Sequence, residues 1–82
     1  MRIAHKNYLS TIGNTPLVAL SRVGEEGLAR VWVKVEGLNA TGSIKSRVAR
    51  SLVQDSLETG KLKMGMGIVE PTCGNLGIAL AM

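Results

Sequence analysis

A lysine stands where an extended segment gives way to a helix, in the stretch NATGSIKSR from Asn39 to Arg47. The pattern places Lys45 in the first turn of that helix, where the positive end of the helix dipole disfavours a cation and relatively favours the neutral amine. A neutral amine is a nucleophile that can attack an aldehyde and afterwards act as a base. The alternative is a solvated lysine that tolerates a mildly unfavourable position, so the neighbouring elements must decide.

The elements on either side of Lys45 are a predicted strand and a predicted helix. Arg30–Glu36 alternates three valines with Trp32, Lys34 and Glu36, which predicts a strand. Ser43 is the expected N-cap of a helix that runs to about Thr59 and stops at Gly60. The apolar stripe of this helix is expected to pack on a sheet, and it consists of Ile44, Val48, Ala49, Leu52, Val53, Ser56 and Leu57.

Further elements are predicted before and after this unit. Gly13 and Asn14 tolerate positive φ and predict a turn ahead of a short extended piece at Leu17–Leu20. The segment IVEP, Ile68–Pro71, is typical of a short buried strand, and TCGNLGIALAM after it predicts a turn followed by two turns of an apolar helix.

The resulting order of strand, loop, helix, strand, loop, helix indicates an α/β fold, an open sheet with flanking helices. We expect residues 1–82 to be an incomplete, truncated amino-terminal part of a larger α/β domain, because parallel units need more strands and helices than this chain offers. The loops GLNATGSIKS and EPTCGNLG each follow a predicted strand. In a parallel sheet both would lie at the carboxyl edge, where ligands bind beside helix N-termini, so we expect them to converge.

Composition narrows the class of function. Ten basic and six acidic residues give a net charge of +4, but the basic residues are scattered, and Tyr8 and Trp32 are the only aromatic residues, so we expect no nucleic-acid partner. A lone His5 and a lone Cys73 exclude a metal cluster and an intrachain disulfide, and we expect Cys73 to be a small buried hydrophobe. We expect no membrane partner and a cytoplasmic protein, because the sequence has neither a membrane-length apolar run nor a secretory leader.

Two common nucleotide-binding motifs do not fit. Gly37 and Gly42 have the first spacing of a phosphate-binding P-loop, but Lys45 does not directly follow Gly42. A dinucleotide-binding Gly-x-Gly-x-x-Gly pattern is absent.

Four linked motifs carry a family resemblance. IGNTPLVAL, VKVEGLNATGSIKSR, SLETGKLKMG and IVEPTCGNLGIALA follow one another in the order and at the intervals of the amino-terminal part of cysteine synthases, or O-acetylserine sulfhydrylases. The chain resembles this family from about Thr11 to Met82. The resemblance implies a tryptophan-synthase-β-like, fold-type II enzyme that depends on pyridoxal 5'-phosphate. It also implies β-replacement, which converts O-acetylserine and sulfide to cysteine and acetate.

The resemblance implies a role for each matching position. Lys45 would be the catalytic residue that holds the cofactor as a Schiff base and moves the α-proton, and Asn75 would hydrogen-bond the ring hydroxyl of the cofactor. The loop that grips the carboxylate of the amino-acid substrate would contain Thr72, Cys73, Gly74 and Leu76.

Three positions depart from the usual family pattern. Cys73 stands for a serine and Leu76 for a threonine, so both weaken hydrogen bonding to the substrate carboxylate. Ser46 stands for a common aspartate after the lysine.

Two other functions stay open. Within the same chemistry, the alternative is a cystathionine β-synthase-like or dehydratase-like enzyme. The family's cofactor-phosphate loop and the residue facing the pyridine nitrogen fall beyond position 82, so we expect this chain alone to be inactive or nearly so. The alternative from another class is a non-catalytic fragment that acts through association, either as a homo-oligomer or with a full-length relative.

Overall fold

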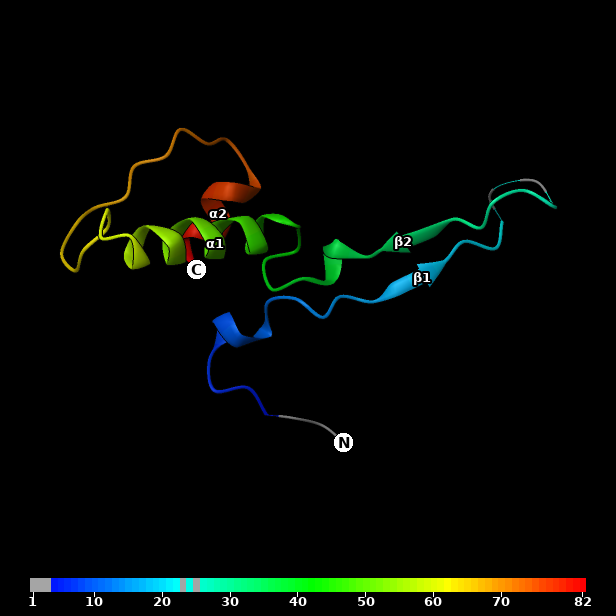
Figure 1. Cartoon of the computed structure of the whole chain (residues 1–82), viewed down its shortest axis with the longest axis horizontal. Helices are drawn as coiled ribbons and strands as arrows, with labels where there is room; N and C mark the ends of the chain where they lie inside the picture. Colours follow the sequence, from blue (N-terminus) through cyan, green and yellow to red (C-terminus); the bar gives the residue numbers. More distant parts are fainter. Residues whose placement is uncertain (1–3, 23, 25) are drawn as a thin grey trace.

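A computed structural model describes residues 4–22, 24 and 26–82, which form a two-stranded arm and a helical part (Figure 1). The chain extends over 56 × 35 × 22 Å and has a radius of gyration of 16.9 Å. A compact domain of this length has a radius of gyration of about 12 Å. The difference arises because the arm projects away from the helices instead of packing on them.

The arm is an antiparallel hairpin. Strand β1 (Leu17–Ala19) pairs with β2 (Trp32–Lys34), and the register places Val18 opposite Val33. Two further backbone hydrogen bonds of 2.9 Å, from Leu20 N–H to the Val31 carbonyl and from Val35 N–H to the Pro16 carbonyl, extend the pairing beyond both ends of the strands. The two strands predicted in this part of the sequence are therefore confirmed, although the second is shorter than expected, and all six strand residues are exposed.

The third predicted strand is wrong. Ile68–Pro71 has no strand structure and lies in an exposed segment, where Val69 is 94% exposed. A strand needs a neighbour for its backbone hydrogen bonds, and within the described residues β1 and β2 are bonded only to each other. The expected parallel arrangement of the second and third strands is therefore absent from the described part of the chain.

Helix α1 (Lys45–Glu58) follows the predicted span closely. Its C-terminal end is as expected, with Gly60 in the left-handed conformation at a φ of +75°. The predicted start is wrong by one residue, because the N-cap is Ile44. Ser43 still contributes, since its hydroxyl accepts a hydrogen bond from the backbone N–H of Lys45 at 3.1 Å.

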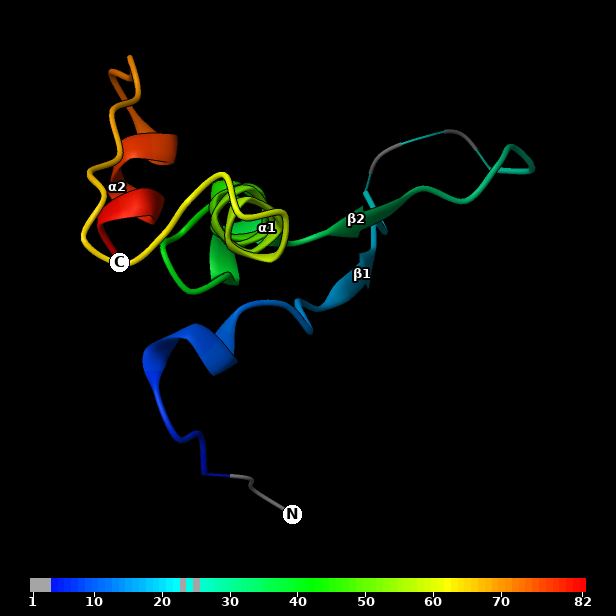
Figure 2. The same cartoon turned by 60° about the vertical axis from the view of Figure 1, so that its left-hand side comes forward.

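The helical core lies between α1 and α2 (Asn75–Ala81), which cross at a steep angle (Figure 2). Ala49 and Ala79 are each 3% exposed, and such small side chains allow two helices to approach closely. The apolar stripe of α1 thus packs partly against a helix. The expectation that it packs on a sheet is wrong for the described residues. Leu52 and Leu57 on this stripe remain about half exposed.

A short 3₁₀ helix, η1 (Tyr8–Thr11), precedes the arm. It was not predicted, because its four residues have no clear hydrophobic period. The Tyr8 hydroxyl donates to the backbone carbonyl of Ala40, and Ile12, directly after η1, is buried. The hydrogen bond of Tyr8 holds this segment against the loop that leads to α1.

A polar network joins the base of the arm to α1. Asn39, which follows the short 3₁₀ helix η2 (Glu36–Leu38), is only 5% exposed. Its side-chain oxygen accepts from the N–H of Gly13 at 3.0 Å and from its neighbour Ala40 at 2.9 Å. Its side-chain nitrogen donates to Glu36 at 2.9 Å, and Arg47 Nε donates to the other Glu36 oxygen at 2.8 Å. The network therefore fixes three separate segments to one another.

The turn predicted from Gly13 and Asn14 is the third of these segments. Both residues have positive φ, +98° and +50°, as expected. Thr15, directly after them, is buried; its hydroxyl accepts from Arg47 at 3.3 Å and its carbonyl from Lys34 Nζ at 2.9 Å. Two cations thus hold this turn against the arm and the helix.

Glu36 has a shifted pKa. Partial burial by itself raises the pKa of this carboxyl, but the hydrogen bonds from Asn39 and Arg47 and the charge of Arg47 together outweigh burial and hold the pKa below its ordinary value of 4.5. The ionised form of Glu36 is therefore the one that the folded chain stabilises.

Acid should weaken the network at Glu36. A carboxylate whose pKa is lowered by folding stabilises the fold above its unfolded-state pKa, and this contribution is lost as the pH falls through the lower folded-state pKa. We expect the urea midpoint of the wild type, followed by the circular dichroism of α1, to fall more between about pH 7 and pH 3 than that of Glu36→Gln. The matched control is Glu70→Gln, which removes an exposed carboxylate. Equal acid sensitivity of wild type and Glu36→Gln would contradict this role.

Candidate functional site

Lys45 is the first residue of α1, as the sequence predicts, and is partly buried. Its backbone N–H is held by Ser43, but within the described residues no hydrogen bond or ion pair engages its side-chain nitrogen. Arg47, its basic neighbour, is bound to Glu36 instead. The Lys45 amine is therefore available to a ligand at the mouth of the helix.

The loop before Lys45 is held by buried polar side chains at both of its ends. Asn39 fixes the first end through the network described above. Ser46 fixes the second end: it is fully buried, and its Oγ accepts from the Thr41 backbone N–H at 3.0 Å and lies 2.5 Å from the Thr41 hydroxyl. The sequence analysis gave neither Asn39 nor Ser46 a positioning role. The only sign in the sequence was that Asn39 and Ser46 are small polar residues on either side of the Gly42 turn.

The second candidate loop is organised by Thr72. Its hydroxyl oxygen accepts from the backbone N–H groups of Gly74 at 3.3 Å and Gly77 at 3.2 Å. A hydroxyl has two acceptor positions and one proton, so this arrangement leaves the Thr72 proton to be donated to a ligand. A Cβ on Gly77 would lie 2.6 Å from Thr72 Cγ2, which explains why glycine occupies this position.

The other predicted residues of this loop lie around Thr72. Asn75 is exposed and is the first residue of α2. Gly74 is also exposed and is the N-cap of α2, whereas Leu76 is partly buried. Cys73 is an exposed free thiol, so the expectation of a small buried hydrophobe is wrong. The reason is local: Cys73 sits in the turn before α2, and residues 71–75 of this turn are all exposed.

The two candidate loops lie at the starts of two helices that pack together (Figures 1 and 2). Lys45 stands one helical turn before Ala49, and Asn75 stands one turn before Ala79. Each predicted cofactor residue is therefore about 6 Å along its helix axis from a buried alanine of the helical core. Within the described residues no hydrogen bond joins the two loops, so their convergence on one ligand stays a prediction.

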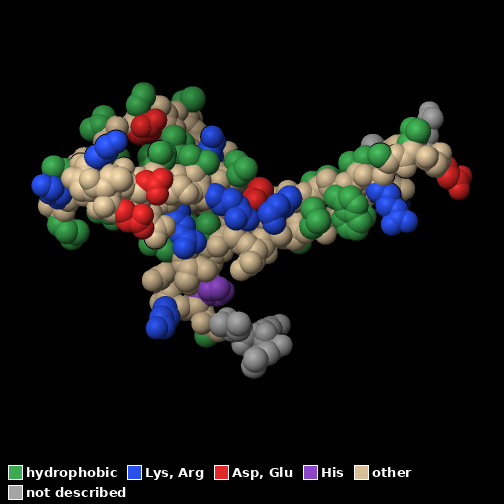
Figure 3. Space-filling view, viewed as in Figure 1, with side chains coloured by type: hydrophobic (Ala, Val, Ile, Leu, Met, Phe, Trp, Pro, Cys, Tyr) green, Lys and Arg blue, Asp and Glu red, His purple; other side chains and the backbone are tan. Residues whose placement is uncertain are grey.

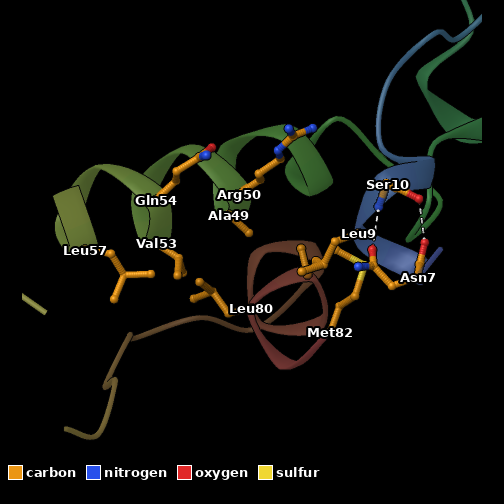
Figure 4. Close-up of a pocket in the computed structure, with 11 residues that line it drawn as sticks. Asn7, Leu9, Ser10, Ala49, Arg50, Val53, Gln54, Leu57, Leu80 and Met82 are labelled. Carbon is orange, nitrogen blue, oxygen red and sulfur yellow. Dashed lines mark hydrogen bonds between the residues drawn. The ribbon is translucent and has the colours of Figure 1, made fainter. Parts of the chain in front are cut away.

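An apolar hollow lies away from these two loops. A groove of about 510 Å³ runs between α1, α2 and η1, with apolar side chains from all three elements around it (Figure 4). It is lined by Asn7, Leu9, Ser10, Ala49, Arg50, Val53, Gln54, Leu57, Ala79, Leu80 and Met82. None of the predicted site residues lines it, and the groove has a single charged residue, Arg50. The mostly apolar lining of this groove is typical of a surface against which side chains pack.

The described residues offer few other kinds of site. In the ranges given above, no cluster of three or more His, Cys, Asp or Glu side chains is placed to hold a metal ion. No helix in that part of the chain is long and apolar enough to cross a membrane. Basic side chains gather where the arm meets the helical part, and apolar ones follow the arm and cover the helices (Figure 3).

Comparison with known proteins gives consistent similarities. The family model described as pyridoxal-phosphate dependent enzyme matches residues 8–82. Cysteine synthase B of Salmonella typhimurium is 50% identical over 72 residues, which are 88% of this chain and 24% of that protein. O-ureido-L-serine synthase of Streptomyces lavendulae is 54% identical over 74 residues, 90% of this chain and 22% of that protein. The crystal structure of cysteine synthase from Entamoeba histolytica superposes with a TM-score of 0.85 and 42% identity over 96% of this chain and 25% of that one.

These comparisons also define the extent of the match. The chain spans about a quarter of the length of the relatives that it matches. Within that quarter the fold agrees closely, because the superposition covers nearly all of the chain. The hairpin and the two helices are thus shared with fold-type II enzymes.

Replacing Gly77 with alanine tests the organisation of the second loop. Alanine is the better helix former by about 1 kcal/mol, so propensity alone would extend α2. We expect the opposite, because the new methyl displaces Thr72 and breaks its bonds to the first turn. Carbon-13 chemical shifts of residues 75–81 should lose helical character in Gly77→Ala.

The double variant Gly77→Ala with Thr72→Ser is the matched control. Serine keeps the hydroxyl and removes Cγ2, so we expect the helical shifts to return. An increase in helical character in Gly77→Ala alone would show that the close approach of Thr72 does not govern this turn.

Proposed function

Because this chain belongs to the family of pyridoxal-phosphate dependent enzymes, we propose that Lys45 is its cofactor-holding lysine. We further propose that the residues around it serve the β-replacement that makes cysteine and acetate from O-acetylserine and sulfide. The observation that carries the proposal is the placement of Lys45 as the first residue of α1, with an amine that no described residue engages. An amine in that state can attack an aldehyde.

The donor set fits pyridoxal phosphate. The Lys45 amine suits a covalent link to the aldehyde, and the Asn75 side chain, exposed at the start of α2, offers an amide to the ring hydroxyl. Within the described residues no hydrogen bond engages either side-chain group. When bound, the cofactor supplies an electron sink that stabilises negative charge at the α-carbon of the amino acid.

The chain's own residues then hold the substrate and move its proton. The Lys45 amine serves as the base that removes the α-proton. The Thr72 hydroxyl, with both acceptor positions occupied by backbone N–H groups, donates its proton to the substrate carboxylate. The two backbone bonds set the direction of this donation, so that Thr72 both caps α2 and orients the substrate.

Carboxylate binding at this loop should be weaker than in relatives with a full set of hydroxyls. Cys73 is a weaker donor than serine, and Leu76 has no donor on its side chain. A hydrogen bond to a charged group contributes roughly 1.5–3 kcal/mol, so each loss weakens binding by about tenfold or more. A cystathionine β-synthase-like or dehydratase-like reaction is the alternative.

Association completes the site in this proposal. The chain spans a quarter of its relatives, and large apolar side chains of the arm are exposed: Leu17 at 61%, Trp32 at 53% and Val18 at 45%. Monomeric soluble proteins rarely leave such surfaces uncovered. We therefore expect a homo-oligomer or association with a longer relative, and a non-catalytic fragment that acts only through association is the second candidate function. An exposed free thiol at Cys73 suits a reducing compartment, which favours the cytoplasm.

Titration of the purified chain with pyridoxal phosphate tests the proposal. We expect a saturable visible absorption band and, after borohydride reduction and peptide mass mapping, an adduct concentrated on Lys45 instead of the exposed Lys61 and Lys63. Lys45→Ala should abolish the band, and Lys61→Ala, which removes an exposed lysine, should leave it intact.

The dependence on chain concentration separates the two candidate functions. If association completes a cofactor site, the band should grow with chain concentration in parallel with an increase in sedimentation coefficient. Association without a Lys45 adduct would favour the non-catalytic fragment. A compact monomer with adducts spread over several lysines would contradict both.

A further inference from the structure

We propose that Ser46 is a positioning residue for Lys45, which it places through a buried hydroxyl pair with Thr41. The inference rests on the proposed function, because it assigns a residue that sets the place of the cofactor-holding amine. Ser46 adjoins Lys45 in the chain and is 0% exposed, so its hydroxyl cannot itself reach a ligand in solvent. Its influence must pass through the backbone.

The hydrogen bonds of Ser46 join the two ends of the short segment, residues 41–46, that contains Lys45. The Ser46 Oγ accepts from the Thr41 N–H at 3.0 Å and lies 2.5 Å from Thr41 Oγ1. Within this segment, Ser43 Oγ accepts a hydrogen bond from the Lys45 N–H at 3.1 Å. Gly42, on the same loop, donates its N–H to the Asn39 carbonyl at 2.9 Å. The backbone that carries the lysine is thus bonded on both sides within residues 39–46.

A purely helical role does not account for a serine here. Serine is a poorer helix former than alanine, because its hydroxyl competes for backbone groups. At a fully buried position in the first turn of α1, alanine would fit the space and favour the helix. The hydroxyl of Ser46 faces the loop and satisfies a loop N–H, so its effect is on the approach to Lys45.

The charges around Lys45 support the same role. Ser46 holds the loop with a neutral group and adds no carboxylate that could pair with the lysine. Arg47, on the other side of Ser46, is bound to Glu36 and Thr15. The Glu36 carboxylate is therefore paired with Arg47 and Asn39, and the Lys45 amine has no ion-pair partner among the described residues.

The test measures how selectively Lys45 is labelled and does not depend on turnover. The full chain is treated with pyridoxal phosphate and borohydride, and the Lys45 adduct is divided by the Lys61 adduct as an internal reference. We expect Ser46→Ala to lower this ratio by roughly ten- to a hundredfold, because a displacement of about 1 Å is enough to misplace a reacting group. The helicity of α1, from circular dichroism, should stay close to that of the wild type.

Matched variants separate positioning from a loss of structure. Thr41→Val removes the partner hydroxyl at similar volume and should also lower the ratio, whereas Thr41→Ser keeps the hydroxyl and should restore it. Ser51→Ala, at an exposed position of the same helix, should change nothing. If Ser46→Ala loses its helicity, the comparison of Thr41→Val with Thr41→Ser decides the question.

Each outcome is informative. A selective wild type whose ratio is unchanged in Ser46→Ala and Thr41→Val overturns the positioning role and leaves the proposed function intact. An unselective wild type overturns the proposed function and this inference together. Loss of selectivity in Ser46→Ala and Thr41→Val, with recovery in Thr41→Ser, supports the inference.

Discussion

The buried amide of Asn39 is the interaction on which the rest of this structure depends. It lies where the arm, the turn after η1 and the loop before α1 meet, and it bonds to all three: to Gly13, to Glu36 and to the neighbouring N–H of Ala40. An unpaired buried donor or acceptor costs about 1–3 kcal/mol, so removal of the amide would cost free energy at its bonding partners as well. Few other contacts connect the arm to the helices, since the hydrophobic core consists mainly of Ile12, Ala49 and Ala79. In a chain with so small an apolar core, directional polar bonds determine how the segments are arranged.

Local patterns predicted those parts of the fold that satisfy their own backbone. Helix α1 has an apolar period and a glycine stop, and each of its residues bonds within the same segment, so its span was predicted nearly to the residue. The turn at Gly13 was found in the same way, whereas the strand around Val33 was found from its alternating pattern and forms because β1 pairs with it. The strand expected at Ile68–Pro71 did not form, because a strand is stabilised by neighbours that its own sequence does not supply. Cys73 was expected to be buried from its residue type alone, but the turn that carries it is exposed.

For the candidate site, the sequence predicted residues with reactive groups and missed the residues that hold the surrounding loops in place. Lys45 drew attention because a cation at a helix start is unusual, its predicted role came from the family resemblance, and it lies in the first turn of α1 as predicted. Ser46, Thr41 and Asn39 are small polar residues of a kind common in loops, and only their burial and bonding distances show that they fix the lysine's loop. The dual use of Thr72 was likewise invisible, because capping by a residue two positions before the N-cap does not follow a standard spacing. The fold thus places the Lys45 amine at the start of α1, directly after a loop whose two ends are bonded. Helix α1 packs against α2, which the second candidate loop precedes.

The role of Asn39 in holding the loop in front of Lys45 is tested most directly by amide hydrogen exchange, measured by NMR in the wild type and in Asn39→Ala. We predict that the amides of Gly13 and Ala40 exchange faster in the variant and that the Thr41 amide follows, while Thr59 at the far end of α1 keeps its rate. Asn39→Asp, which keeps an oxygen acceptor, should retain more of the protection at Gly13. Unchanged exchange at Gly13, Ala40 and Thr41 in Asn39→Ala would contradict the account.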